Sequence, residues 1–333
     1  MKAKIFGLFF LFLIFVFFIQ AVVFSLSFFT LINNKILEIP GLKAIQKDIY
    51  FKGHRILWQQ KKECVNFDVD LIYVPSFNNC VFENVEFKTT LNFDRYGRKN
   101  ENNFKERINE KIAILGDSET MGWGVNNNET FSSLIEKNLK IKTYNLGVSS
   151  YGTYREILRL KKLNNIRDIK TIIIQYSWND KGENDKFDNF DRGESEKAYE
   201  YLMDVGKKRT DTDLSKNIKF VLRRFKSSFR VFYKDLLNTL LSRNENIQDF
   251  LPHYNSLINV INKFDFLKNK KIIIFALGDR VTFNNFNEGF DKNNKNIYFL
   301  NLSLNEKHFF KLDGHLNKSG HKEVAYQLLN HLK

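Results

Sequence analysis

The sequence predicts an α/β fold built on a parallel sheet, and three observations support that prediction. Five short apolar runs, rich in Ile and other β-formers, are spaced along residues 111–302. Amphipathic helical segments separate most of these runs, so strands and helices alternate. A long uncharged segment at residues 5–32 stands apart from this pattern. Apolar strands that alternate with helices favour a parallel sheet with both faces covered.

The uncharged N-terminal segment predicts a membrane-spanning helix. It follows two lysines, ends before Lys35, and at about 1.5 Å per residue is long enough for a hydrocarbon core of ~30 Å. We expect residues 1–32 to form an uncleaved signal anchor; a signal peptide cleaved after Ala21 is the alternative. With the two lysines inside, the protein would be single-pass, with its catalytic domain on the extracytoplasmic side of the membrane.

Residues 33–107 are interpreted as a membrane-proximal segment. Its first part, to about residue 60, mixes basic and apolar positions and is expected to be helical or irregular. Residues 64–92 alternate apolar and polar side chains around the turn sequence PSFNN, which predicts short strands. Cys64 and Cys80 lie in this part, and either a local disulfide or two buried thiols fits the sequence.

Residues 108–333 are interpreted as the main domain, interrupted by a largely helical, charged insertion at about 181–268. The predicted strands are residues 111–116, 141–147, 171–176, 271–277 and 296–302. The predicted helices outside the insertion are residues 129–139, 154–163 and 321–332, with Asn317 or Ser319 as the cap of the last one.

The composition limits the classes of partner. The formal charge of +14 is spread along the chain, without an arginine-rich arm or a zinc-finger, RRM or helix-turn-helix signature, so no nucleic-acid partner is expected. A basic surface suits anionic lipid headgroups or acidic glycans, although it also fits an ordinary solvated surface. No cofactor and no metal are expected, because phosphate-binding glycine patterns and ligand clusters are missing from the sequence. The oligomeric state is left open.

Chemically suitable residues follow the predicted strands, where ligands of open parallel sheets bind. Strand one ends in GDS at Ser118, and the last strand leads into DGH. A serine hydroxyl becomes nucleophilic when a base takes its proton, and that base must be oriented by a third group. Asp313 lies two residues before His315, which makes Ser118, His315 and Asp313 the candidate catalytic residues. His321 is the competing base, but its place in the first turn of a helix favours a structural role.

An ester-cleaving site also needs donors for the oxyanion. The backbone N–H of Ser118 is one candidate. The side-chain amide of Asn179, in the SWND sequence after the third strand, is the second, because it donates without carrying charge. Trp123 and Trp178 lie beside these residues in the sequence and would line a pocket or pack in the core.

Taken together, GDS, NLGVSSYG, SWND and DGH with LNKSGH resemble, in this order, the SGNH subgroup of the GDSL hydrolases, over about residues 111–333. The resemblance implies a three-layer α/β/α flavodoxin-like fold with a five-stranded parallel sheet, and ester or acyl-transfer chemistry. It also implies a third oxyanion donor, the backbone N–H of Ser150, where the family has glycine; Gly147 and Gly152 are the alternatives. NFDRYGR at residues 92–98 resembles a short element that often precedes such domains.

The expected function is therefore that of a membrane-anchored serine esterase of the SGNH type. It would act on an acyl ester or acylated glycan through an acyl-serine intermediate. One alternative is an O-acyltransferase that modifies an envelope polysaccharide, because the Asp-x-His spacing resembles that of SGNH enzymes that O-acetylate exported polysaccharides. The alternative of another class is a catalytically inactive protein that binds a glycan or a partner.

Overall fold

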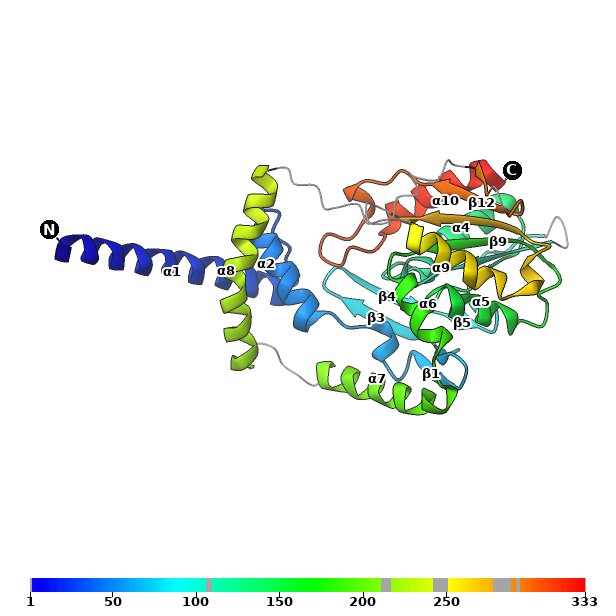
Figure 1. Cartoon of the computed structure of the whole chain (residues 1–333), viewed down its shortest axis with the longest axis horizontal. Helices are drawn as coiled ribbons and strands as arrows, with labels where there is room; N and C mark the ends of the chain where they lie inside the picture. The colour runs from blue at the N-terminus through cyan, green and yellow to red at the C-terminus, as the bar shows by residue number, and fades with distance from the viewer. Residues whose placement is uncertain are drawn as a thin grey trace.

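The computed structural model describes residues 2–105, 110–210, 217–241, 251–277, 289–291 and 294–332. An α/β domain carries the C-terminus, and a long helix projects from the other end of the molecule with the N-terminus at its tip (Figure 1). The α-helices in the described residues are α1 (Lys2–Ile32), α2 (Leu42–Ile49), α3 (Ser118–Met121), α4 (Phe131–Leu139), α5 (Thr153–Lys161), α6 (Asp180–Asp188), α7 (Ser195–Thr210), α8 (Ile218–Leu241), α9 (Leu251–Asn262) and α10 (Lys318–Leu332).

The described strands form one large sheet and two small hairpins. The strands are β1 (Val65–Asp68), β2 (Ile72–Pro75), β3 (Cys80–Asn84), β4 (Phe87–Leu91), β5 (Phe93–Asp94), β6 (Gly97–Arg98), β7 (Lys111–Leu115), β8 (Thr143–Asn145), β9 (Ile169–Tyr176), β10 (Lys271–Ala276), β11 (Gly289–Phe290) and β12 (Ile297–Asn301). β1 pairs with β2 and β3 pairs with β4, both antiparallel.

Within the described residues, the large sheet has eight strands in the order β11-β12-β10-β9-β7-β8-β6-β5, where the sequence predicted five. The five predicted strands are β7, β8, β9, β10 and β12, which are adjacent and parallel. β11 extends one edge, and the β5–β6 hairpin extends the other through the antiparallel pair Arg98 and Asn145. These additional strands have two residues each, which is too short to give a periodic pattern in the sequence.

Helices pack on both faces of the parallel strands. Successive side chains of a strand point to opposite faces. Ile172 and Ile174 of β9 therefore pack in one apolar cluster with residues of α5 and α9, whereas Ile173 packs in another with residues of α4 and α10. Because both faces are buried, the central strands are continuous runs of Ile and not an alternation of apolar and polar residues. Asn317 caps α10 by accepting hydrogen bonds from the N–H groups of Ser319 and Gly320.

Residues 33–105 pack directly on the α/β domain. A disulfide joins Cys64 and Cys80. Trp58 and Phe82 belong to the same apolar cluster as Trp123, which follows α3. The segment before the domain and the α/β domain therefore share a hydrophobic core near the carboxyl ends of the parallel strands.

The N-terminal helix is long and apolar enough to cross a membrane. An 18-residue window within Ile5–Ile32 has a mean hydropathy of 2.8, and most of this window is exposed. Its C-terminal end packs with α2 and α8, where Phe24, Phe28 and Leu31 are buried. In Figure 1, α8 runs across α1 at this junction.

Candidate active site

The residues that follow β7 form a tight turn that presents Ser118. Gly116 has a φ of +151°, and a Cβ there would lie 2.1 Å from Oγ1 of Thr120, so the turn requires glycine. Asp117 caps α3 by accepting a hydrogen bond from the N–H of Glu119 at 2.9 Å. Ser118 thereby becomes the first residue of α3, at the carboxyl end of a central strand.

The structure brings Ser118, His315 and Asp313 into one hydrogen-bonded chain. Oγ of Ser118 lies 2.7 Å from Nε2 of His315. Nδ1 of the same imidazole is hydrogen-bonded to Oδ1 of Asp313. The three groups occur in the order nucleophile, base and orienting acid that a serine hydrolase uses.

Asp313 is held by residues that the sequence analysis did not single out. The hydroxyl of Tyr50 donates to Oδ2, and Nε of Arg55 donates to the same oxygen at 3.0 Å. Glu86 accepts hydrogen bonds from the backbone N–H groups of Leu312 and Asp313, both at 2.8 Å, and so fixes the loop. Burial raises the pKa of the Asp313 carboxyl, but His315, Arg55 and Tyr50 lower this pKa by more, so the group is ionised at neutral pH.

The environment of His315 favours the charged imidazole. Burial lowers the pKa of His315, but the charges of Glu119 and Asp313 outweigh it and raise this pKa above 6.5. Burial also raises the pKa of Glu119 to about 7. Oε2 of Glu119 accepts a hydrogen bond from the N–H of Leu316 at 2.8 Å. The ring of Trp123 stacks on the imidazole at a centroid distance of 4.7 Å, which fixes the plane of the base.

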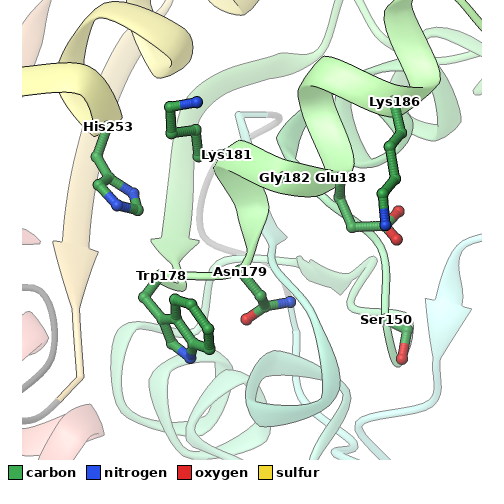
Figure 2. Close-up of a pocket in the computed structure, with 8 residues that line it drawn as sticks. All are labelled: Ser150, Trp178, Asn179, Lys181, Gly182, Glu183, Lys186 and His253. Atoms are coloured by element: carbon green, nitrogen blue, oxygen red, sulfur yellow. The ribbon is translucent and has the colours of Figure 1, made fainter.

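A cleft of ≈ 1060 Å³ opens over these residues. Ser118, Asp313 and His315 line it together with the predicted oxyanion residues Ser150 and Asn179. An adjoining hollow of ≈ 490 Å³ shares Ser150 and Asn179 with the cleft. In the view of Figure 2, the amide of Asn179 lies between the Trp178 ring and Ser150.

Ser150 adopts the left-handed conformation that its position in the loop requires. Its φ is +62°, which is uncommon for a residue with a Cβ. Nε2 of Gln59 donates to Oγ of Ser150 at 2.9 Å, and Arg155 donates to its carbonyl oxygen. These contacts hold the loop in the strained conformation. Among the described residues, neither alternative donor lines the cleft: Gly147 packs against the backbone of Met121, and Gly152 precedes α5.

The competing base, His321, lies away from Ser118. Its Nδ1 accepts a hydrogen bond from the N–H of Phe131 at 3.2 Å, and its ring stacks on that phenylalanine. Burial lowers the pKa of His321 to about 3, so it is neutral at physiological pH.

The two tryptophans that lie beside the site in the sequence have different surroundings. Trp123 is buried beside the imidazole of His315, whereas Trp178 is 44% exposed on the cleft wall.

Arg98, at the end of NFDRYGR, supports the nucleophile turn. Its buried guanidinium donates to the backbone carbonyl oxygens of Met121, Gly122 and Val125, and to Oδ1 of Asn127. Burial lowers its pKa to about 9. The sequence analysis treated this element only as a resemblance that marks the start of the domain, and nothing in its local spacing indicated the contacts of Arg98.

Within the part of the chain that the structure describes, no cluster of three or more His, Cys, Asp or Glu side chains has the arrangement that holds an ion.

Comparison with known proteins adds weak likenesses. No protein-family model and no curated protein matches the sequence. Among solved structures, a GDSL-like lipase from Bacteroides thetaiotaomicron is 12% identical, and the match covers 68% of this chain and 91% of that one with a TM-score of 0.27. AlinE4, an SGNH-hydrolase family esterase, is 14% identical, with 49% of this chain and 96% of that one covered and a TM-score of 0.20. At these scores, the geometry of the cleft is the basis for a functional proposal.

Proposed function

We propose that the protein is a membrane-anchored serine esterase of the SGNH type. One observation carries the proposal: Oγ of Ser118 lies 2.7 Å from Nε2 of His315, whose other nitrogen is hydrogen-bonded to a buried, ionised Asp313. This arrangement supplies a nucleophile, a base and an orienting acid in the wall of one cleft.

The reaction would proceed through an acyl-serine intermediate. His315 removes the hydroxyl proton of Ser118 as Oγ attacks the ester carbonyl carbon, and the carbonyl π electrons move to oxygen. The imidazolium then protonates the leaving alkoxide as the C–O bond breaks. Water, deprotonated in turn by His315, attacks the acyl group and releases the acid and the free serine. Asp313 keeps the proton on Nδ1 and stabilises the imidazolium in both halves of the reaction.

The oxyanion would be bound by the backbone N–H groups of Ser118 and Ser150 and by the amide of Asn179. Donors placed before the reaction stabilise developing charge without reorganisation, and one such donor is commonly worth about 3 kcal/mol. The backbone of Ser150 is left-handed, and its side chain accepts a hydrogen bond from Gln59. This fixed conformation supports Ser150, over Gly147 and Gly152, as the third oxyanion donor.

A second candidate is acyl transfer to a sugar hydroxyl, and the hollow beside the cleft favours it. The hollow shares Trp178, Asn179 and Ser150 with the cleft, so an acceptor bound there would lie next to the acyl group. Incubation with an acyl donor and a polysaccharide acceptor separates the two reactions. A transferase leaves acyl groups on the sugar, whereas an esterase releases free acid.

The anchor and the location are part of the same proposal. We infer that α1 spans the membrane with its lysines in the cytoplasm and that the cleft lies outside it. The disulfide between Cys64 and Cys80 supports this location, because such bonds persist in oxidising compartments.

Substitution of the nucleophile tests the function. In the full chain, Ser118→Ala is expected to lower kcat/KM for a short-chain aryl ester by roughly 10⁴-fold or more. It should also abolish covalent labelling by a fluorophosphonate. Ser303→Ala, at an exposed serine outside the cleft, is the matched control and should keep full activity. Wild-type protein that is neither labelled nor active would favour the binding protein without catalysis.

A further inference from the structure

Helix α8 carries more apolar surface than its packing covers. One side of it packs on α1 and α2, where Ser228 is buried and Phe225 lies in their apolar cluster. Six large apolar side chains on the adjoining side are exposed: Ile218, Leu222, Phe229, Tyr233, Leu236 and Leu237. Five exposed basic residues lie beside this strip: Lys219, Arg223, Lys226, Arg230 and Lys234.

The contacts of α8 decide which way the apolar strip faces. Phe225 packs edge-on against Phe17 of α1 at a centroid distance of 5.5 Å, and Ser228 accepts a hydrogen bond from Gln20 at 2.5 Å. Phe225 also packs edge-on against Phe24 at a centroid distance of 5.4 Å, so the Phe225 side of α8 rests on α1 around Gln20. Phe229, four residues after Phe225, continues that side.

The flank of α8 opposite the apolar strip faces α2 and the catalytic domain. Nη1 of Arg224 and Oγ of Ser227 both donate to the carboxylate of Asp48 on α2, at 3.1 Å. Helix α2 also contributes Lys47 to the lining of the catalytic cleft. Helix α8 therefore separates the exposed length of α1 from the cleft, and it runs across α1 as Figure 1 shows.

We propose that α8 lies flat in the headgroup region of the bilayer that α1 enters. Its apolar strip would be buried among the upper acyl chains, and its basic residues would contact anionic phospholipid headgroups. Exposed apolar surface of this extent marks an interaction site, and a basic amphipathic helix suits an anionic membrane surface. The strip adjoins Phe225, which packs on Phe17 of α1. The proposal rests on the membrane insertion of α1 stated above.

Fluorescent labels on the full chain test this placement. The two native cysteines are joined in the disulfide, so a single added cysteine can be labelled selectively. An environment-sensitive label is attached in separate variants at Leu222→Cys and Leu237→Cys, and the protein is reconstituted in phosphatidylcholine vesicles with or without phosphatidylglycerol. A label at Phe10→Cys reports on α1. A label at Tyr201→Cys, an exposed aromatic position on α7, is the matched control.

Both α8 labels are expected to shift to the blue and to be quenched by lipids with a nitroxide high on the acyl chain. The Tyr201→Cys label should show neither effect. Phosphatidylglycerol should increase the quenching of the α8 labels, and the added substitutions Lys226→Glu and Arg230→Glu should remove that increase.

Three results would overturn the placement. If the Phe10→Cys label is quenched while the α8 labels match the control, α8 is not in the bilayer although α1 is. If the Phe10→Cys label is not quenched either, α1 is not inserted in the bilayer, and the placement of α8, which depends on that insertion, is also wrong. If the α8 labels are shielded only as the protein-to-lipid ratio rises, the strip packs on a second copy of the chain. Fluorophosphonate labelling of Ser118 in the same vesicles reports separately on the esterase chemistry.

Discussion

The hydroxyl of Tyr50 allows a direct test of how the segment before the α/β domain holds the carboxylate of Asp313. Tyr50 is fully buried, and its hydroxyl donates to Oδ2 of Asp313. Tyr50→Phe removes that donor and keeps the ring in its packing site, so no cavity forms. Asp313 retains the donors of Arg55 and His315. The substitution therefore isolates one hydrogen bond to a buried carboxylate.

The expected effects on stability and catalysis differ in size. A hydrogen bond to a charged group contributes about 1.5–3 kcal/mol, so the free energy of unfolding should fall by that amount in Tyr50→Phe. The same bond exists in the ground state and in the transition state, and most of its energy cancels from the activation barrier. Since tenfold in rate corresponds to about 1.4 kcal/mol, we expect kcat/KM to fall by less than tenfold.

The effect on stability is measured by denaturant unfolding of the full chain in detergent. The effect on catalysis is measured by ester hydrolysis at saturating and limiting substrate. Tyr326→Phe, at an exposed tyrosine of α10, is the control and should change the free energy of unfolding by less than about 0.5 kcal/mol. A Tyr50→Phe variant as stable as the wild type would refute the hydrogen bond. A loss of kcat/KM of a hundredfold or more at unchanged stability would instead place Tyr50 in the chemistry.

Three further predictions follow from the surroundings of the site. The negative charge of Glu119 raises the pKa of His315, and the base must be neutral, so Glu119→Gln should move the rising limb of the pH profile of kcat/KM to lower pH. Arg98→Met removes the charged donor from the carbonyl oxygens of Met121, Gly122 and Val125, of which the last two keep a second donor, and should lower the free energy of unfolding by at least about 3 kcal/mol, measured by denaturant titration. Replacing Cys64 and Cys80 by serine opens a loop of 16 residues and should cost about 3 kcal/mol, measured in the same way.

Matched controls separate these effects from general perturbation. Glu306→Gln removes another acid from the lining of the cleft and should leave the pH profile in place; an unmoved profile in Glu119→Gln as well would contradict the electrostatic reasoning. Lys99→Met changes an exposed cation next to Arg98 and should be nearly neutral. Wild-type protein whose unfolding midpoint is insensitive to a reductant would argue against a stabilising disulfide.

The parallel strands were predictable because each is a run of buried apolar residues with a distinct start and end. The two-residue strands β5, β6 and β11 were not, since pairs of residues carry no periodicity and form strands only where a neighbouring strand offers hydrogen bonds. The sheet consequently has eight strands in place of five. The choice between a disulfide and two thiols also depended on tertiary structure, which brings β3 and the segment before β1 together.

The sequence by itself determined the candidate nucleophile, base and acid, because Ser118, Asp313 and His315 each follow a strand whose carboxyl end the parallel sheet directs to one edge. Only the tertiary structure decided what holds the acid. Tyr50 lies 263 residues before Asp313, and Arg55 lies 258 residues before it. No local spacing records contacts over such distances: they exist because α1, α2 and α8 pack together and place the turn after α2 against the catalytic loop.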